Sequence, residues 1–388
     1  TIAPATLAAD PFESTAGLQT PRPASLADPA DIFAPKRRAS QGWDVNNVSV
    51  LREIERLRSP FVEHRWEASS IVGFEMESAA PPGDRQILNP ADPGDCVGAV
   101  QEADAAACAM AIGVAQAWEQ VGAAQRAVVL RSAADLYEQH AGELLALLAR
   151  EAGKTLPAAL AELRAAVDFL RYYANATEGA NAADGESAPN PSQPELAPRG
   201  IFACISPWNF PLAIFTGQIA AALAAGNAVV AKPAETTPLV ACLAVRLLHA
   251  AGVPRTALQL LLGDGATVGA PLTSDSRLAG VCFTGSTGTA LAINKAMARH
   301  LPPSAVLIAE TGGINAGIVD STALPEQAIR DAIASAFQSA GQRCSALRVL
   351  YLQDDVADLL LEMLFGAMDE LEVGNPWHLT TDVGPVIS

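Results

Sequence analysis

A glutamate and a cysteine in the last third of the chain could together perform covalent chemistry on an electrophilic carbon. Glu310 precedes a threonine and two glycines, and Cys344 follows the turn-forming sequence Ala340-Gly341-Gln342-Arg343. A thiolate is a nucleophile, and a carboxylate beside it can act as a general base. Their spacing does not show that they meet, so the elements that position them decide the question.

Three other groups follow short apolar segments. Asn209 lies in SPWNFP after IFACI, Lys232 lies in AKPAE after AVV, and Ser286 lies in FTGSTG after GVCF. A side-chain amide can donate to an oxyanion, together with a backbone N–H such as that of Cys344. A helix that opens with small residues is an anion site. Each group also has a plainer explanation, namely a turn asparagine, a surface lysine or a helix cap.

Short apolar strands alternate with helices from residue 201 onward. We expect strands at 201–205, 228–231, 258–262, 280–283 and 305–309, separated by helices at 212–225, 238–251, 266–273 and 287–299. This alternation is typical of a parallel, doubly wound α/β sheet, which binds ligands at the carboxyl ends of its strands. The groups named above all lie at such ends.

The flanking segments predict further elements. Residues 1–66 are expected to be a tail or linker with one short helix, and residues around Asn89 and Pro93 a pair of strands. Apolar spacing predicts helices at 101–119, 122–151 and 156–178. Residues 179–197 are polar and predict a loop or arm. From residue 310 a second α/β unit begins, with strands at 315–320 and 347–353 and helices at 326–340 and 356–372.

Composition excludes several classes of protein. The 388 residues carry a net charge of −17, which argues against binding to nucleic acid or an anionic membrane. We expect no membrane-spanning segment and no signal peptide. The basic cluster Lys36-Arg37-Arg38 is interpreted as a solvated linker. Six cysteines, without a CxxC pair, predict reduced thiols in a cytoplasmic protein and no metal site.

Five ordered motifs resemble those of the aldehyde dehydrogenase superfamily. They are ISPWNFPLAIF at 205–215, AKPAETTPL at 231–239, FTGST at 283–287, ETGG at 310–313 and FQSAGQRCSA at 337–346. The residues of these motifs are most similar to those of the glutamate γ-semialdehyde dehydrogenase half of the bacterial proline utilization A family. The resemblance implies an NAD-binding domain at 67–309 and the N-terminal portion of a catalytic domain at 310–388.

The resemblance also implies roles for residues. Cys344 is the expected nucleophile, Glu310 the base and Asn209 the oxyanion donor. Ser345 and Phe210 are expected to contact the substrate. Glu235 would favour NAD over NADP, because a carboxylate repels a 2′-phosphate. The residues expected to bind NAD are Ile205, Pro207, Trp208, Lys232, Glu235, Gly265, Thr284, Gly285, Ser286, Thr311 and Gly312.

The implied activity is NAD-dependent oxidation of L-glutamate γ-semialdehyde to L-glutamate, within proline catabolism. Alternatives are an aldehyde dehydrogenase for another small aldehyde and a catalytically incomplete NAD-binding fragment. The expected partners are a second copy in a dimer, or a proline dehydrogenase unit in a longer parent. Gly288 departs from the family, which usually has a glutamate there, and we find no later cofactor motif before Ser388.

Overall fold

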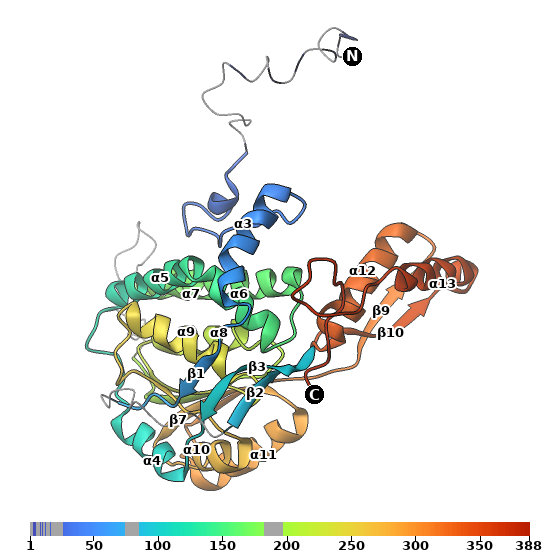
Figure 1. Cartoon of the computed structure of the whole chain (residues 1–388). Helices are drawn as coiled ribbons and strands as arrows, with labels where there is room; N and C mark the ends of the chain where they lie inside the picture. Colours follow the sequence, from blue (N-terminus) through green and yellow to red (C-terminus); the bar gives the residue numbers. More distant parts are fainter. Residues whose placement is uncertain are drawn as a thin grey trace.

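A computed structural model describes residues 26–73, 85–181 and 197–388, together with a few single residues before position 26. Residues 182–196, most of the predicted arm, lie outside the described ranges. Figure 1 shows one large α/β body with a small red and orange unit beside it. Within the described ranges, no helix is both long and apolar enough to cross a membrane.

The centre of the large body is a parallel sheet of five strands. These are β4 (Ile201–Ile205), β5 (Ala228–Lys232), β6 (Leu258–Leu260), β7 (Leu278–Gly285) and β8 (Val306–Thr311). Their order is β6-β5-β4-β7-β8, and all pairs are parallel. The strand order reverses between β4 and β7, which is where such sheets bind ligands. The prediction of a doubly wound sheet is confirmed.

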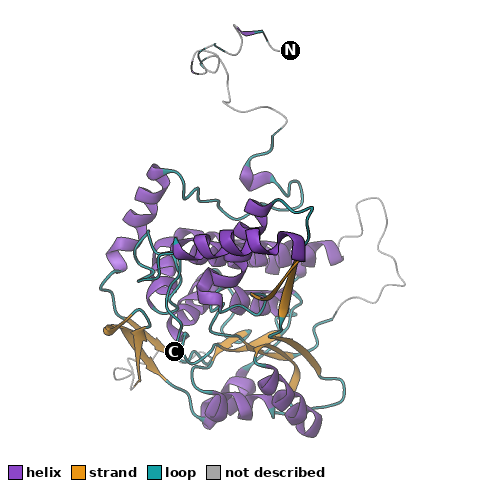
Figure 2. Cartoon of the chain, turned by 90° about the vertical axis from the view of Figure 1, so that its right-hand side faces the viewer, coloured by secondary structure: helices purple, strands orange, loops and turns teal. Residues whose placement is uncertain are grey.

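Helices cover both faces of this sheet (Figures 1 and 2). One layer contains α5 (Ala123–Gln139), α6 (Ala141–Arg150), α7 (Leu156–Asn181), α8 (Ala213–Ala224) and α9 (Pro238–Ala250). The other contains α4 (Ala105–Val114), α10 (Ala270–Thr273) and α11 (Thr287–His300). Each layer buries its own apolar cluster against the sheet. Both faces of the five-stranded sheet are therefore shielded from water, as expected for strands that are apolar on both sides.

Two helix predictions before residue 152 have wrong bounds. The single helix at 122–151 is two helices, because His140 has φ −92° and ψ 19° and breaks the helical path between α5 and α6. The helix at 101–119 shortens to α4, since strand β3 occupies residues up to Gln101 and Ala115 is already extended. Apolar spacing alone did not reveal either break.

A smaller sheet precedes the large one. It consists of β1 (Trp66–Ser69), β2 (Arg85–Asn89) and β3 (Asp92–Gln101) in the order β1-β3-β2. The antiparallel β2–β3 pair confirms the predicted strand pair, whereas β1, parallel to β3, was not predicted. The predicted short helix is α3 (Val48–Arg58), which follows the 3-10 turn η1 (Pro29–Asp31) and precedes η2 (Ser59–Phe61).

The basic cluster is not a fully solvated linker. Arg37 forms an ion pair of 2.6 Å with Asp168 of α7, and only 16% of its side chain is exposed. Ser40 is buried and donates to the same carboxylate over 2.8 Å. The interpretation of residue 37 as solvated is therefore wrong, because a carboxylate on a distant helix binds it.

The small unit contains β9 (Asn315–Val319) and β10 (Leu347–Leu352), which are parallel, and helices α12 (Pro325–Phe337) and α13 (Asp354–Asp369). The predicted helix at 326–340 ends at Phe337, and the 3-10 turn η4 (Gln338–Gly341) follows. Strand β8 continues to Thr311, so Glu310 lies within the five-stranded sheet. A domain boundary between 309 and 310 would cut this strand.

The buried carboxylate of Glu151, which follows α6 and binds the first turn of α9, makes the free energy of unfolding depend on pH. Both oxygens of Glu151 accept amide hydrogen bonds, from Leu239 over 2.7 Å and Val240 over 2.9 Å. Burial nevertheless raises the pKa of Glu151 to about 8, against the smaller opposing effects of these amides and of Arg85. The folded state therefore holds a proton that the unfolded state releases near the ordinary glutamate pKa.

We expect the free energy of unfolding to fall as the pH rises from about 4.5 to about 8, because the unfolded chain binds fewer protons in this range. Glu151→Gln, which is neutral at every pH, should remove this component. Urea titrations of both proteins between pH 5 and 8.5 measure it. A constant difference between them across that range would contradict the prediction.

Candidate active site

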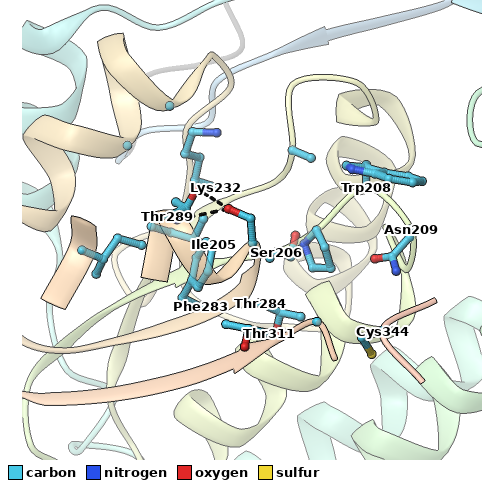
Figure 3. Close-up of a pocket in the computed structure, with 18 of the residues that line it drawn as sticks. Ile205, Ser206, Trp208, Asn209, Lys232, Phe283, Thr284, Thr289, Thr311 and Cys344 are labelled. Carbon is cyan, nitrogen blue, oxygen red and sulfur yellow. Dashed lines mark hydrogen bonds between the residues drawn. The ribbon is translucent and has the colours of Figure 1, made fainter. Parts of the chain in front are cut away.

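A cavity of about 910 Å³ opens at the carboxyl ends of the strands, beside α10 and α11. Every residue predicted to bind NAD lines it: Ile205, Pro207, Trp208, Lys232, Glu235, Gly265, Thr284, Gly285, Ser286, Thr311 and Gly312. Cys344 and Asn209 line it as well. Figure 3 shows these two residues toward one end and Lys232 toward the other.

Lys232 ends β5 and is 3% exposed. Its ammonium donates to the Pro233 carbonyl over 3.1 Å. Burial lowers the pKa of Lys232, and the nearby carboxylates, Glu235 first, oppose this effect. Glu235 is exposed, and Arg85 of β2 holds its backbone carbonyl over 2.7 Å. A donor and an acceptor on one loop can bind the two hydroxyls of a ribose.

The start of α11 can accept an anion. Ser286 caps this helix by accepting from the amide of Thr289 over 3.1 Å. A side chain at Gly285 would place its Cβ 2.5 Å from the Phe283 ring, so a small residue is required. The hydroxyl of Ser206 in the same cavity is buried without a hydrogen-bond partner. Open amides, small residues and an unpaired hydroxyl together fit a pyrophosphate-bearing dinucleotide.

The nucleophile candidate sits on a tightly held turn, residues 339–346, which we call the thiol turn. Among the six free cysteines, Cys344 alone is exposed, while Cys108, Cys204 and Cys242 are buried. Asn315 of β9 donates its amide to the Cys344 carbonyl over 2.7 Å and to the Ala346 carbonyl over 3.0 Å. These bonds fix the backbone at Cys344 and immediately after it.

Asn209 lies on the loop between β4 and α8, residues 206–212, which we call the Asn209 loop. Its amide nitrogen donates to the carbonyl of Gln342 over 2.8 Å. A primary amide has two N–H groups, so one remains available to a ligand. The Asn209 loop and the thiol turn are therefore joined directly, with the Cys344 side chain close to their junction (Figure 3).

Three predicted site residues do not line this cavity. Glu310 is exposed and precedes Thr311, which does line it, and successive strand residues point to opposite faces. Ser345 is exposed beside Cys344. Phe210 packs between two cations: its ring centre lies 4.6 Å from the Lys154 ammonium and 5.7 Å from the Arg343 guanidinium carbon.

Sequence reasoning missed four residues that support the site. They are Asn315, Gln342, Lys154 and Glu162. Gln342 lies inside the motif FQSAGQRCSA, and Asn315 follows ETGG by two residues, so their proximity to Cys344 and Glu310 was a usable signal. Lys154 and Glu162 lie about 50 residues before the Asn209 loop, and no local sequence pattern indicates that they contact this loop. Among the described residues, no cluster of His, Cys, Asp or Glu is arranged to hold a metal.

The thiol turn contains backbone strain that a substitution can relieve. Ser339 and Ala340 have φ of 56° and 55°, in the left-handed region that disfavours side chains. We expect Ala340→Gly to raise the free energy of unfolding by about 0.5 kcal/mol, since relief of strain exceeds the entropy that glycine adds to the unfolded chain. Thermal unfolding measures the change. Ala334→Gly, in helix α12, should destabilise instead, and a loss in both variants would contradict the expectation.

Comparisons with known proteins agree with this geometry. The aldehyde dehydrogenase family profile matches residues 78–388. Bifunctional protein PutA of Klebsiella aerogenes is 49% identical over 97% of this chain, which spans 28% of that relative. The 1-pyrroline-5-carboxylate dehydrogenase of Anoxybacillus flavithermus is 37% identical over 77% of this chain and 60% of its own length.

Solved structures are similar over most of the chain. A 1-pyrroline-5-carboxylate dehydrogenase from Thermus with bound NAD has a TM-score of 0.80 and 30% identity, covering 90% of this chain and 69% of that one. A Bradyrhizobium japonicum proline utilization A structure has a TM-score of 0.77 and 43% identity, covering 92% of this chain and 34% of that one. The chain, with its parallel sheet and its cysteine at the cavity, therefore belongs to the aldehyde dehydrogenase family.

Proposed function

We propose that this chain carries out the NAD-dependent oxidation of L-glutamate γ-semialdehyde to L-glutamate. The observation that carries the proposal is the cavity that joins Cys344 and Asn209 to Lys232 and Glu235. The substrate is supported by the relatives named for 1-pyrroline-5-carboxylate, the cyclic form of this semialdehyde. The chain spans only part of the length of these relatives. The activity of the whole protein is therefore also a proposal.

In this proposal the Cys344 thiol loses its proton to a base, the resulting thiolate forms a C–S bond to the aldehyde carbon, and the carbonyl oxygen becomes an oxyanion. The free N–H of Asn209 and the backbone N–H of Cys344 donate to that oxygen. A bound nicotinamide would supply the hydride acceptor. Once the substrate has lost its hydride, Cys344 carries a thioester. Water then attacks the thioester carbon, the C–S bond breaks, and the thiolate leaves.

Glu310 is the proposed general base for the water. Its support is the resemblance of ETGG at 310–313 to the family's motif. Its placement does not add support, since Glu310 and Thr311 of the cavity wall are successive residues of β8 and point to opposite faces. To act, its carboxylate has to reach the cavity from the edge strand, where it is exposed. Ser345, adjacent to Cys344, and Phe210, adjacent to Asn209, are proposed to contact the substrate.

The proposed preference for NAD rests on Glu235. Glu235→Gln removes the charge that would repel a 2′-phosphate, so the KM for NADP should fall by about tenfold, corresponding to roughly 1.4 kcal/mol. The KM for NAD should rise, because a carboxylate acceptor for the ribose is lost. Initial rates with both cofactors measure this. Exposed Glu119→Gln is the control, and an unchanged NADP preference in Glu235→Gln would contradict the assignment.

We further propose a cytoplasmic location, because a free-thiol nucleophile needs a reducing compartment. Assembly as a homodimer, or beside a proline dehydrogenase unit in a longer bifunctional parent, is proposed from the family resemblance and from relatives named as bifunctional. The competing proposal is an NAD-binding fragment without turnover, which the small two-stranded unit holding Cys344 supports.

The deciding experiment supplies NAD and glutamate γ-semialdehyde and follows NADH formation, with NAD binding measured separately by calorimetry. Turnover supports the proposed oxidation. NAD binding without turnover supports the fragment. Absence of both would overturn the two proposals, and turnover only with other aldehydes would overturn the assigned substrate.

A further inference from the structure

A buried ion pair lies behind the Asn209 loop, outside the cavity wall. Lys154 lies between α6 and α7, and Glu162 lies on α7. Their charged atoms are 2.9 Å apart, with 3% and 0% of the side chains exposed. Removing two charges from water carries a large desolvation cost, so such a pair is poor evidence of stabilisation by itself. Its other contacts indicate what it does.

Both members of the pair hold the backbone of the Asn209 loop. The Lys154 ammonium donates to the Asn209 carbonyl over 2.6 Å. One Glu162 oxygen accepts from the amides of Leu212, over 2.8 Å, and Ala213, over 3.2 Å. The other oxygen faces Lys154. The pair therefore fixes the residue that carries the amide and also the start of α8, at both sides of Phe210.

From Asn209 the contact continues to the thiol turn. The Asn209 side chain donates to Gln342, two residues before Cys344. Gln342 in turn contacts both the thiol turn and a distant segment: its amide nitrogen donates to the Ser339 carbonyl over 2.9 Å, and its oxygen accepts from the amide of Ile387 over 2.9 Å. A displacement of the Asn209 backbone would thus change both the position of the Asn209 side-chain amide and its distance to the Cys344 sulfur.

We infer that Lys154 and Glu162 are positioning residues, which set the Asn209 amide relative to Cys344 without touching the substrate. The inference rests on the proposed oxidation for its catalytic consequence. Misplacement of a catalytic group by about 1 Å can cost up to about 100-fold in rate. The competing explanation is that the pair merely secures α6 against α7, in which case its loss would act on stability and independently of Asn209.

The test removes both charges together, because one unpaired buried charge would endanger folding. In Lys154→Met with Glu162→Gln, the glutamine oxygen can still accept from Leu212 and Ala213, whereas the tether to the Asn209 carbonyl is lost. The matched control is Arg171→Met with Glu138→Gln. That pair, at 2.8 Å, is also largely buried, and Glu138 also accepts a backbone amide, from Gln41 over 2.7 Å.

Two quantities are measured: kcat, and the alkylation rate of Cys344 by iodoacetamide, resolved by peptide mass spectrometry. We expect kcat to fall about tenfold in the Lys154/Glu162 variant, with the KM for NAD unchanged. The alkylation rate of Cys344 should rise severalfold, since the thiol turn is no longer held in place through the Asn209 loop. The Arg171/Glu138 control should keep both values while losing comparable thermal stability.

The decisive comparison adds Asn209→Ala. If the pair acts through Asn209, the Lys154/Glu162 changes have no further effect on either quantity in that background. Three outcomes would overturn the inference. The effects of Asn209→Ala and of the Lys154/Glu162 changes could add, Asn209→Ala alone could leave the alkylation rate of Cys344 at its wild-type value, or the Arg171/Glu138 control could change kcat and alkylation as much as the Lys154/Glu162 variant does. Absence of turnover in the wild type would overturn the proposed function for this chain, and the alkylation rates would still judge the positioning role.

Discussion

Cys344→Ala is expected to abolish NADH formation from glutamate γ-semialdehyde, with a loss of at least about 10⁴-fold in kcat, because among the described residues that line the cavity Cys344 is the only thiol that can form the proposed covalent intermediate. The exposed Cys344 side chain reaches the cavity from a turn held by Asn315 through backbone atoms alone. Removing the sulfur should therefore leave the fold unchanged. The KM or Kd for NAD should also stay near its wild-type value, since Lys232 and Glu235 are distant along the cavity.

The control is Cys96→Ala, which removes a half-buried thiol on β3. It should retain turnover, so a loss specific to Cys344 cannot be attributed to thiol content in general. Calorimetry with NAD checks the cofactor end of Cys344→Ala. Residual turnover above about 1% of the wild-type rate would show that another residue supplies the nucleophile.

The strand ends explain why so much of the site could be predicted. Lys232 ends β5 and Gly285 ends β7, and the alternation of apolar strands with helices in the sequence indicates this edge. Parallel strands bring their carboxyl ends to one side of a sheet, so local sequence sufficed to predict that the residues proposed to bind NAD line one cavity. The motif FQSAGQRCSA likewise placed Cys344 at the cavity.

Other features depend on contacts between distant parts of the chain. Arg37 is held by Asp168, and the Asn209 loop is held by Lys154 and Glu162. Neither pair produces a local pattern in the sequence. Glu310 is the opposite case: its motif was recognised, but the phase of strand β8, which decides the face it occupies, could not be read from a glycine-flanked strand end.

Asn209→Ala should lower kcat by about 100-fold, because it removes one of the two proposed donors to the developing oxyanion. The KM for NAD should change little, since Lys232 and Glu235 bind the far end of the cofactor in the proposed complex. The chemical step itself is measured by single-turnover formation of NADH. A slowed single turnover identifies a loss of transition-state stabilisation, whereas a slowed steady state alone would point to product release.

A matched control distinguishes this effect from the loss of a structural amide. Asn227 is a buried asparagine, whereas Asn209 is half-buried, and the Asn227 side chain accepts from the amides of Arg199, over 2.7 Å, and Gly200, at the other end of β4. Asn227→Ala should destabilise the fold and leave kcat unchanged. Since the Asn209 amide donates to the Gln342 carbonyl, equal losses of kcat in both variants would mean that this amide serves only to join the loop to the thiol turn.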